Sequence, residues 1–170
     1  AALVGRLLGA RRETARVLSV RGATVLMAAR SQAKAVEAGR NFAQSVIPLE
    51  CDLSQPGSVR QCVEQVKQTG RLLDGIIANA GIMALPRWEQ RYGYELQFLT
   101  NHLGHFILIT GLIDQLTDKG RVTLVSSRAH HRTYPEGIQF DNLSGEKGYS
   151  PWLAYGQSKL ANLLMARSLA

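Results

Sequence analysis

Short apolar runs alternate with longer segments of helical periodicity along almost the whole chain, and this alternation constrains the fold most. The runs expected to be strands are Ala1–Gly5, Ala23–Ala29, Val46–Leu49, Leu73–Ala78 and Val122–Val125. The segments expected to be helices are Ala10–Val20, Ser31–Asn41, Ser58–Gln68, Tyr94–Leu116 and Leu153–Leu169. Strands that are apolar on both faces belong to parallel sheets covered by helices. We therefore predict an α/β fold, a doubly wound parallel sheet of the Rossmann type.

The length of the chain and its apolar runs bound the class of protein. Its 170 residues suit one domain, so we expect a single domain over residues 1–170. No apolar run reaches the length of a membrane span, and Ala1–Gly9 does not have the pattern of a secretory signal. Cys51 and Cys62 form neither a disulfide framework nor a metal-binding spacing. We expect a cytoplasmic protein with no membrane span and no metal site.

The formal charge of +7 raises the question of an acidic partner. Many of the arginines crowd the N-terminal part of the chain: Arg6, Arg11, Arg12, Arg16, Arg21 and Arg30. A basic face can attract nucleic acid, a membrane surface or a phosphorylated ligand. These arginines are not interleaved with aromatic residues, which argues against a nucleic-acid platform. We favour a phosphate-bearing cofactor.

Tyr155 and Lys159 are spaced to share one face of the last predicted helix. A tyrosine ordinarily ionises only near pH ~10, and a neighbouring ammonium group favours the phenolate. Such a tyrosine can give a proton to a carbonyl oxygen or take one from an alcohol. The other interpretation is a half-buried tyrosine beside a surface lysine.

The predicted strands end in small or polar residues, at the sheet edge where ligands bind in this fold class. Ser127 follows Val122–Val125, where a hydroxyl can donate a hydrogen bond to a developing oxyanion. Asn79-Ala80-Gly81 follows the fourth strand, where small residues let a flat ligand approach the backbone. Each feature is also common as a plain turn or strand end.

Together these motifs resemble the short-chain dehydrogenase/reductase family, and within it the retinol-dehydrogenase-like branch. The residues that carry the resemblance are Asn101–Phe106 (NHLGHF), Val125–His131 (VSSRAHH), Phe140–Leu143 (FDNL) and Ala154–Asn162 (AYGQSKLAN). The resemblance implies that Tyr155 is the acid–base residue, assisted by Lys159, which also holds the nicotinamide ribose. It further implies that Ser127 binds the substrate oxygen and that Asn101 supports a water-linked proton relay to the lysine.

The resemblance also implies a cofactor site. Its residues are Gly5 and Gly9 of the glycine loop, Asp52, Leu53, Asn79, Ala80, Gly81, Tyr155 and Lys159. Arg30 ends the second predicted strand, where an arginine suits a 2′-phosphate better than a free hydroxyl. Arg6, inside the glycine loop, offers a second contact. We therefore expect NADP, with NAD as the alternative.

The glycine loop departs from the family pattern. Val4 stands in place of the family's threonine, and Arg11 in place of its third glycine. We expect weaker cofactor binding than an intact loop would give. The chain also ends inside the helix that carries Tyr155, so the C-terminal strands of family members are expected to be missing.

The implied activity is the interconversion of a small lipophilic alcohol and an aldehyde or ketone with NADP(H). The alternative is a catalytically weak nucleotide-binding or interaction module with a degraded glycine loop. The segment Arg128–Ser150 is expected to be a loop that walls the substrate pocket, and Trp88 and Trp152 either line that pocket or pack elsewhere. The resemblance also implies a homodimer, formed through the helices at Tyr94–Leu116 and Leu153–Leu169.

Overall fold

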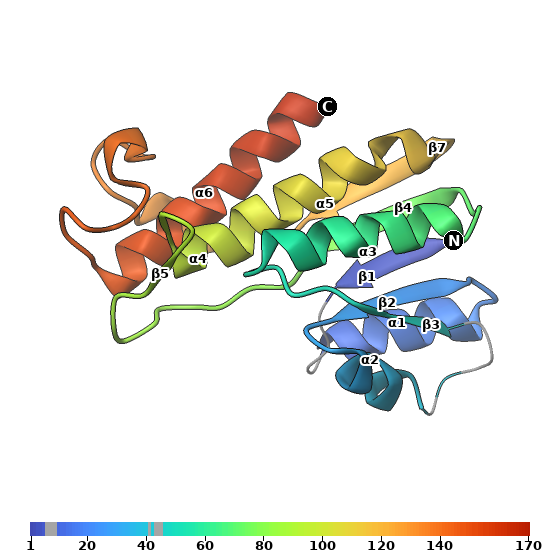
Figure 1. The fold of residues 1–170 in the computed structure, drawn as a ribbon. Helices are drawn as coiled ribbons and strands as arrows, with labels where there is room; N and C mark the ends of the chain where they lie inside the picture. The colour runs from blue at the N-terminus through green and yellow to red at the C-terminus, as the bar shows by residue number, and fades with distance from the viewer. Residues whose placement is uncertain (6–9, 41, 43–45) are drawn as a thin grey trace.

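The computed structural model describes residues 1–5, 10–40, 42 and 46–170 of the chain (Figure 1). Arg6 and Gly9, two of the expected cofactor contacts, lie outside the described residues.

A parallel sheet forms the centre of the fold. Its strands are β1 (Ala2–Gly5), β2 (Val25–Ala29), β3 (Val46–Glu50), β4 (Leu73–Ala78) and β7 (Leu116–Leu124). They lie in the order β3-β2-β1-β4-β7, and every neighbouring pair is parallel. The chain therefore runs outward from β1 to β3 and then returns past β1 to β4. This reversal confirms the predicted doubly wound fold and places a ligand-binding crevice beside the carboxyl ends of the strands.

Helices cover both faces of the sheet (Figure 1). Their bounds are α1 (Ala10–Val20), α2 (Gln32–Gly39), α3 (Pro56–Gln68), α5 (Gly104–Leu112) and α6 (Pro151–Leu169). Alternate side chains of β2 point to opposite faces: Leu26 joins the core under α3 and α5, while Met27 joins a smaller core under α1. The continuous apolar run in this strand thus reflects burial on both faces.

The predicted helix over Tyr94–Leu116 is correct for most of its length and wrong at its ends. A short helix α4 (Leu96–Phe98) leads into a π-helical turn, η1 (Leu99–Leu103), then into α5 and a 3₁₀ turn, η2 (Ile113–Gln115). Before it, β6 (Tyr94–Glu95) pairs antiparallel with β5 (Gln90–Arg91). The Glu95 carboxylate accepts a hydrogen bond from Phe98 N and so caps the helix start.

The segment Leu96–Gln115 is apolar enough to cross a membrane by length and composition alone, with a mean hydropathy of 1.2. The expectation that no run reaches that length is therefore wrong for this segment. Within the fold, however, 61% of the segment's most apolar window is buried against the rest of the chain. That burial is the behaviour of the core helix of a globular domain.

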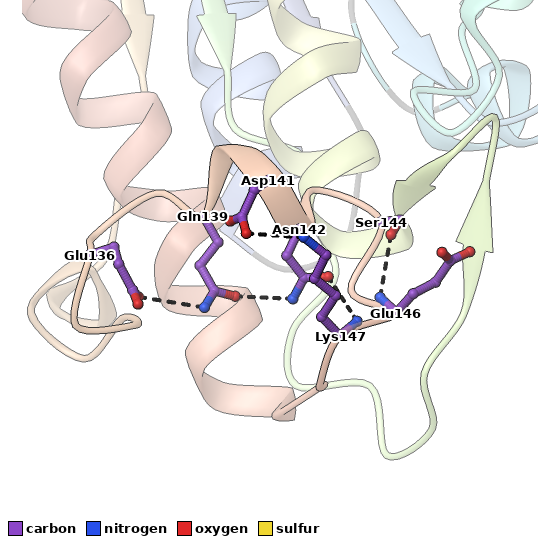
Figure 2. A network of polar contacts seen from close by, with 7 residues as sticks. All are labelled: Glu136, Gln139, Asp141, Asn142, Ser144, Glu146 and Lys147. Carbon is purple, nitrogen blue, oxygen red and sulfur yellow. Dashed lines mark hydrogen bonds and ion pairs between the residues drawn. The ribbon is translucent and has the colours of Figure 1, made fainter.

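The loop after β7 has internal structure of its own. It contains two 3₁₀ turns, η3 (Arg128–His131) and η4 (Phe140–Asn142). Figure 2 shows the polar contacts around η4, where Gln139 Oε1 accepts from Asn142 Nδ2 and Lys147 Nζ contacts Asp141. The loop is also fixed to α6, because Gln157 Oε1 accepts a hydrogen bond of 2.8 Å from Gln139 N.

Candidate active site

Tyr155 and Lys159 lie one turn apart on α6, as their spacing predicted. Pro151 occupies the first turn of this helix, where its missing N–H leaves no bond unmade. Lys159 is only 4% exposed, and its Nζ donates a hydrogen bond of 3.0 Å to Val125 O at the end of β7. The same Nζ lies 5.8 Å from the centre of the Tyr155 ring. The ammonium group is therefore held between the sheet edge and the tyrosine.

Ser127 and Tyr155 line one cavity of about 390 Å³. Ser127 is the N-cap of η3, and its Oγ accepts a hydrogen bond of 3.2 Å from Ala129 N. A hydroxyl can accept and donate at the same time, so this bond leaves the Ser127 proton available to a ligand. The preceding Ser126 Oγ donates to Lys159 O at 2.8 Å, which joins this strand end to α6.

Gly156 explains why the turn that carries Ser127 lies so close to Tyr155. The η3 backbone packs directly on α6 at this glycine. A Cβ at position 156 would lie 2.6 Å from Ala129 O and would overlap the carbonyl oxygen of Arg132. Glycine is therefore required here for close approach. The prediction from sequence did not single out Gly156, although a glycine inside a helix was a signal of it.

Asn101 lies in the π-helical turn, is fully buried and connects three segments. Its Oδ1 accepts from Ile82 N at 2.8 Å, and its Nδ2 donates to Ile82 O and to Ser158 Oγ, both at 2.9 Å. Its carbonyl oxygen accepts from Asn162 Nδ2 at 3.0 Å. Ser158 and Asn162 were not predicted as site residues. Their spacing of three and seven residues from Tyr155, on one helix face, was the available signal.

The turn after β4 packs against the side chains of Asn101 and Lys159. A Cβ at Gly81 would lie 2.9 Å from Asn101 Oδ1 and 3.6 Å from Lys159 Nζ. The structure thus brings together Gly81, Asn101 and Lys159, which the sequence placed far apart.

A second cavity, which we call the cofactor groove, lies at the carboxyl ends of β2, β3 and β4. Of the predicted cofactor contacts it is lined by Arg30, Asp52, Leu53, Ala80 and Gly81. Asn79 is half-buried in the same turn and does not line this cavity, and Gly5 ends β1. The cavity is small, about 30 Å³, and its lining is mostly apolar.

The lining also includes a polar atom. Thr100 Oγ1 lines this cavity and is buried without a hydrogen-bond partner among the described residues. Gly104 lets α5 approach the Leu53 backbone, because a Cβ there would overlap Leu53 O. These residues would hold the adenosine part of a dinucleotide.

Gln97 was not predicted, yet it is fully buried and supports the walls of the site. Its Oε1 accepts from Ala84 N at 2.6 Å, and its Nε2 donates to Tyr149 OH at 3.0 Å and to Pro151 O at 3.2 Å. Burial, followed by the nearby Glu95, raises the pKa of Tyr149 to about 12. Tyr149 therefore stays protonated and donates to Leu85 O. Through these bonds Gln97 joins Pro151, at the start of α6, to Ala84 in the segment after β4.

The two tryptophans differ in position. Trp152 lines the Ser127–Tyr155 cavity, and its ring meets the Tyr155 ring edge-on with centroids 6.2 Å apart. Trp88 instead donates from Nε1 to Ser144 O and does not line that cavity.

The described part of the chain holds no cluster of three histidine, cysteine or acidic residues that could bind a metal ion. Nδ1 of His102 lies within hydrogen-bond distance of Asn162 Oδ1, and Nδ1 of His105 within that distance of Asn101 O.

Comparisons with known proteins agree with this architecture. A family model described as short chain dehydrogenase matches residues 1–170. The chain is 40% identical to the short-chain dehydrogenase TIC 32 B, chloroplastic, of Brassica napus, covering 100% of this chain and 57% of that protein. It is 38% identical to retinol dehydrogenase 12 of Mus musculus, covering 99% of this chain and 54% of that protein. The chain thus spans about half the length of these curated relatives.

A solved structure of an uncharacterised protein from Mycobacterium paratuberculosis is 43% identical to the chain. It superimposes with a TM-score of 0.87 over 99% of this chain and 60% of that one.

Proposed function

The chain belongs to the short-chain dehydrogenase family, and from that premise we propose that it interconverts an alcohol and a carbonyl compound with NADP(H), using Tyr155 as the acid–base residue. One observation carries the proposal. Ser127 and Tyr155 line one cavity, and Lys159 lies one turn from Tyr155 beside the cofactor groove.

The side chains divide the proton chemistry between them. The bound nicotinamide would supply or accept the hydride. In the direction of reduction, the Ser127 hydroxyl donates a hydrogen bond to the carbonyl oxygen, and the Tyr155 hydroxyl gives its proton to that oxygen. Lys159 Nζ, 5.8 Å from the centre of the Tyr155 ring, places a positive charge beside the group that gives the proton. The oxidation of an alcohol uses the same groups in reverse.

Asn101 acts as a positioning residue in this proposal. Its side chain holds the turn after β4 against α6, and so it keeps Gly81 beside Lys159. The water-linked relay that the family resemblance implies for Asn101 stays a prediction.

The choice of NADP(H) rests on Arg30. This arginine directly follows β2, lines the groove with Asp52, and is exposed. A guanidinium group in this place can bind a 2′-phosphate.

The charge of Arg30 can be removed to test this choice. Arg30→Ser is expected to weaken NADPH binding about tenfold, the low end for a lost charge-assisted hydrogen bond, and to leave NADH binding unchanged. Titration of the cofactor's fluorescence measures both. Arg60→Ser, an equal change on the exposed face of α3, is the control. Equal weakening of NADPH and NADH in Arg30→Ser would rule out a contact with the 2′-phosphate.

The substrate is proposed to be a small lipophilic alcohol, aldehyde or ketone. The apolar side chains of Met83 and Trp152 in the cavity support this, as does the similarity to a protein named as a retinol dehydrogenase. The direct experiment follows NADPH consumption at 340 nm by the purified protein over a panel of carbonyl compounds. Consumption of NADPH supports the proposal. Tight NADPH binding without consumption would favour the alternative, a nucleotide-binding module.

A homodimer is also proposed. An apolar groove between α5 and α6, lined among others by the exposed side chains of Phe106, Leu164 and Leu169, supports it. The cytoplasmic location expected from the sequence stays a prediction.

A further inference from the structure

The cavity beside Tyr155 has a basic wall and an apolar wall. The basic wall is η3 and the residue after it, which contribute Arg128, His131 and Arg132. The apolar wall is Met83 and Trp152, which are 59% and 57% exposed. Among the described residues, no aspartate or glutamate lines this cavity. Such a cavity offers positive charge to whatever binds in front of Ser127 and Tyr155.

These positive charges have no acidic partner within the part of the chain that the structure describes around the cavity. Over residues 46–170, which include the whole cavity, neither Arg128 nor Arg132 forms an ion pair. Both side chains are exposed. Glu136, the acidic residue that follows in the loop, instead accepts a hydrogen bond from Gln139 Nε2. The two guanidinium groups are therefore available to an anion from solution.

The basic wall is fixed relative to the reacting groups. Its backbone packs on Gly156, the neighbour of Tyr155 in α6. Ser127 caps the turn, and His130 Nδ1 lies 2.6 Å from Ser127 O. The His130 and His131 rings lie against each other, tilted by 37°, with their centroids 3.9 Å apart. An anion bound by these arginines would thus be held at a defined distance from the Ser127 hydroxyl.

We propose that the substrate carries an anionic group, a carboxylate or a phosphate, and that Arg128 and Arg132 bind it while Tyr155 acts on the alcohol or carbonyl carbon. This inference rests on the proposed function and narrows its substrate class. The carbon skeleton lies against Met83 and Trp152. The carboxylate or phosphate and the reacting carbon occupy one cavity of about 390 Å³, so only a few bonds separate them.

The first test compares matched substrates. A ketone with a carboxylate a few carbons away, its methyl ester, and the phosphate monoester of the same skeleton are reduced by the purified protein with NADPH. The wild type is expected to favour the carboxylate or the phosphate over the ester by about tenfold in kcat/KM, through KM. Whichever anion has the lower KM identifies the group that is bound. Equal kcat/KM for all three compounds overturns the proposal.

A double variant assigns the preference to the basic wall. In Arg128→Gln/Arg132→Gln the KM of the anionic substrates is expected to rise until the three compounds are equal. NADPH affinity is expected to stay the same, which separates this site from a cofactor phosphate contact. Arg167→Gln removes a positive charge from the exposed end of α6 and should keep the preference. A preference that survives in the double variant contradicts the proposal.

A binding measurement separates the anion site from the chemistry. The chain has two tryptophans, so Trp88→Phe leaves Trp152 in the cavity as the single tryptophan. Without cofactor, the keto acid is expected to quench Trp152 fluorescence at lower concentration than its ester, and this difference should shrink as ionic strength rises. If the protein shows this quenching but no turnover, the anion site is supported and the proposed function is not. Equal quenching by acid and ester overturns the anion site whatever the turnover.

Discussion

The cofactor groove and the catalytic half of the site are built differently. In the groove, Asp52 makes local contacts: its Oδ1 accepts from Ser54 N and Ser54 Oγ, two residues away. In the catalytic half, Asn101 bonds to Ser158 across 57 residues, and Lys159 bonds to Val125 across 34. Buried networks of this kind rigidify a site but leave unsatisfied groups when a member is removed. The stability of the fold should therefore depend on the catalytic half far more than on the groove.

The largest effect is expected at Asn101. Asn101→Ala removes the bonds to Ile82 N, Ile82 O and Ser158 Oγ and leaves buried groups without partners. We expect it to lower the free energy of unfolding by about 3 kcal/mol. Asp52→Asn keeps an oxygen that can accept from Ser54, so it should change the free energy of unfolding by about 0.5 kcal/mol or less. Urea denaturation of both variants measures the contrast. Similar losses in the two variants would remove the distinction between the halves.

A smaller effect is expected at Gly156. Alanine inside a helix is ordinarily more stable than glycine by about 1 kcal/mol. Here the added Cβ would meet the carbonyl oxygens of Arg132 and Ala129, so Gly156→Ala should destabilise the protein by about 2 kcal/mol. It should also lower turnover more than NADPH affinity, because η3 carries Ser127.

Gly57→Ala is the matched control, since a Cβ at this position in α3 would meet nothing within 4 Å. It should leave stability equal or slightly higher. If Gly156→Ala behaved like Gly57→Ala, the packing of η3 on α6 would not position the site.

The smallest effect concerns Glu95, which is 2% exposed. Burial raises the pKa of its carboxyl, and the amide groups of Gln97 and Phe98 offset only part of that rise. The folded state therefore holds the proton more tightly than the unfolded state. Wild type should lose stability relative to Glu95→Gln as the pH rises from the ordinary glutamate range, ~4.3, through the raised pKa. Urea denaturation of both proteins at several pH values tests the sign, and a pH-independent difference would contradict it.

The sheet and most helices were predictable because their signals are local. The bounds of α1 and β4 match the predicted segments, since apolar periodicity and buried runs decide them. The π-helical turn at Leu99–Leu103 and the pair β5–β6 were not predicted. The π-helical turn is tied to α6 by a contact that sequence spacing does not reveal, the bond of Asn101 to Ser158. The pair β5–β6 is local, but its strands have two residues each and are too short to show an alternating pattern.

The part of the site that lies in recognisable sequence motifs was predictable. The residues predicted to be catalytic, Ser127, Tyr155, Lys159 and Asn101, meet at the carboxyl end of the sheet. The basic wall of Arg128 and Arg132 was not foreseen, because only the packing of η3 on Gly156 directs it into the same cavity as Tyr155. Gln97 was missed for a similar reason, since two of its partners, Tyr149 just before α6 and Pro151 at its start, lie more than fifty residues away.

The role of Tyr155 is the central claim, and removal of its hydroxyl tests it most directly. Tyr155→Phe should abolish NADPH-dependent turnover while NADPH affinity, measured by cofactor fluorescence, stays within about twofold of wild type. Tyr92→Phe removes a hydroxyl that instead contacts Gln55 on the exposed surface, and it should keep full turnover. Turnover in Tyr155→Phe equal to that of wild type would contradict the assignment of acid–base chemistry to this tyrosine.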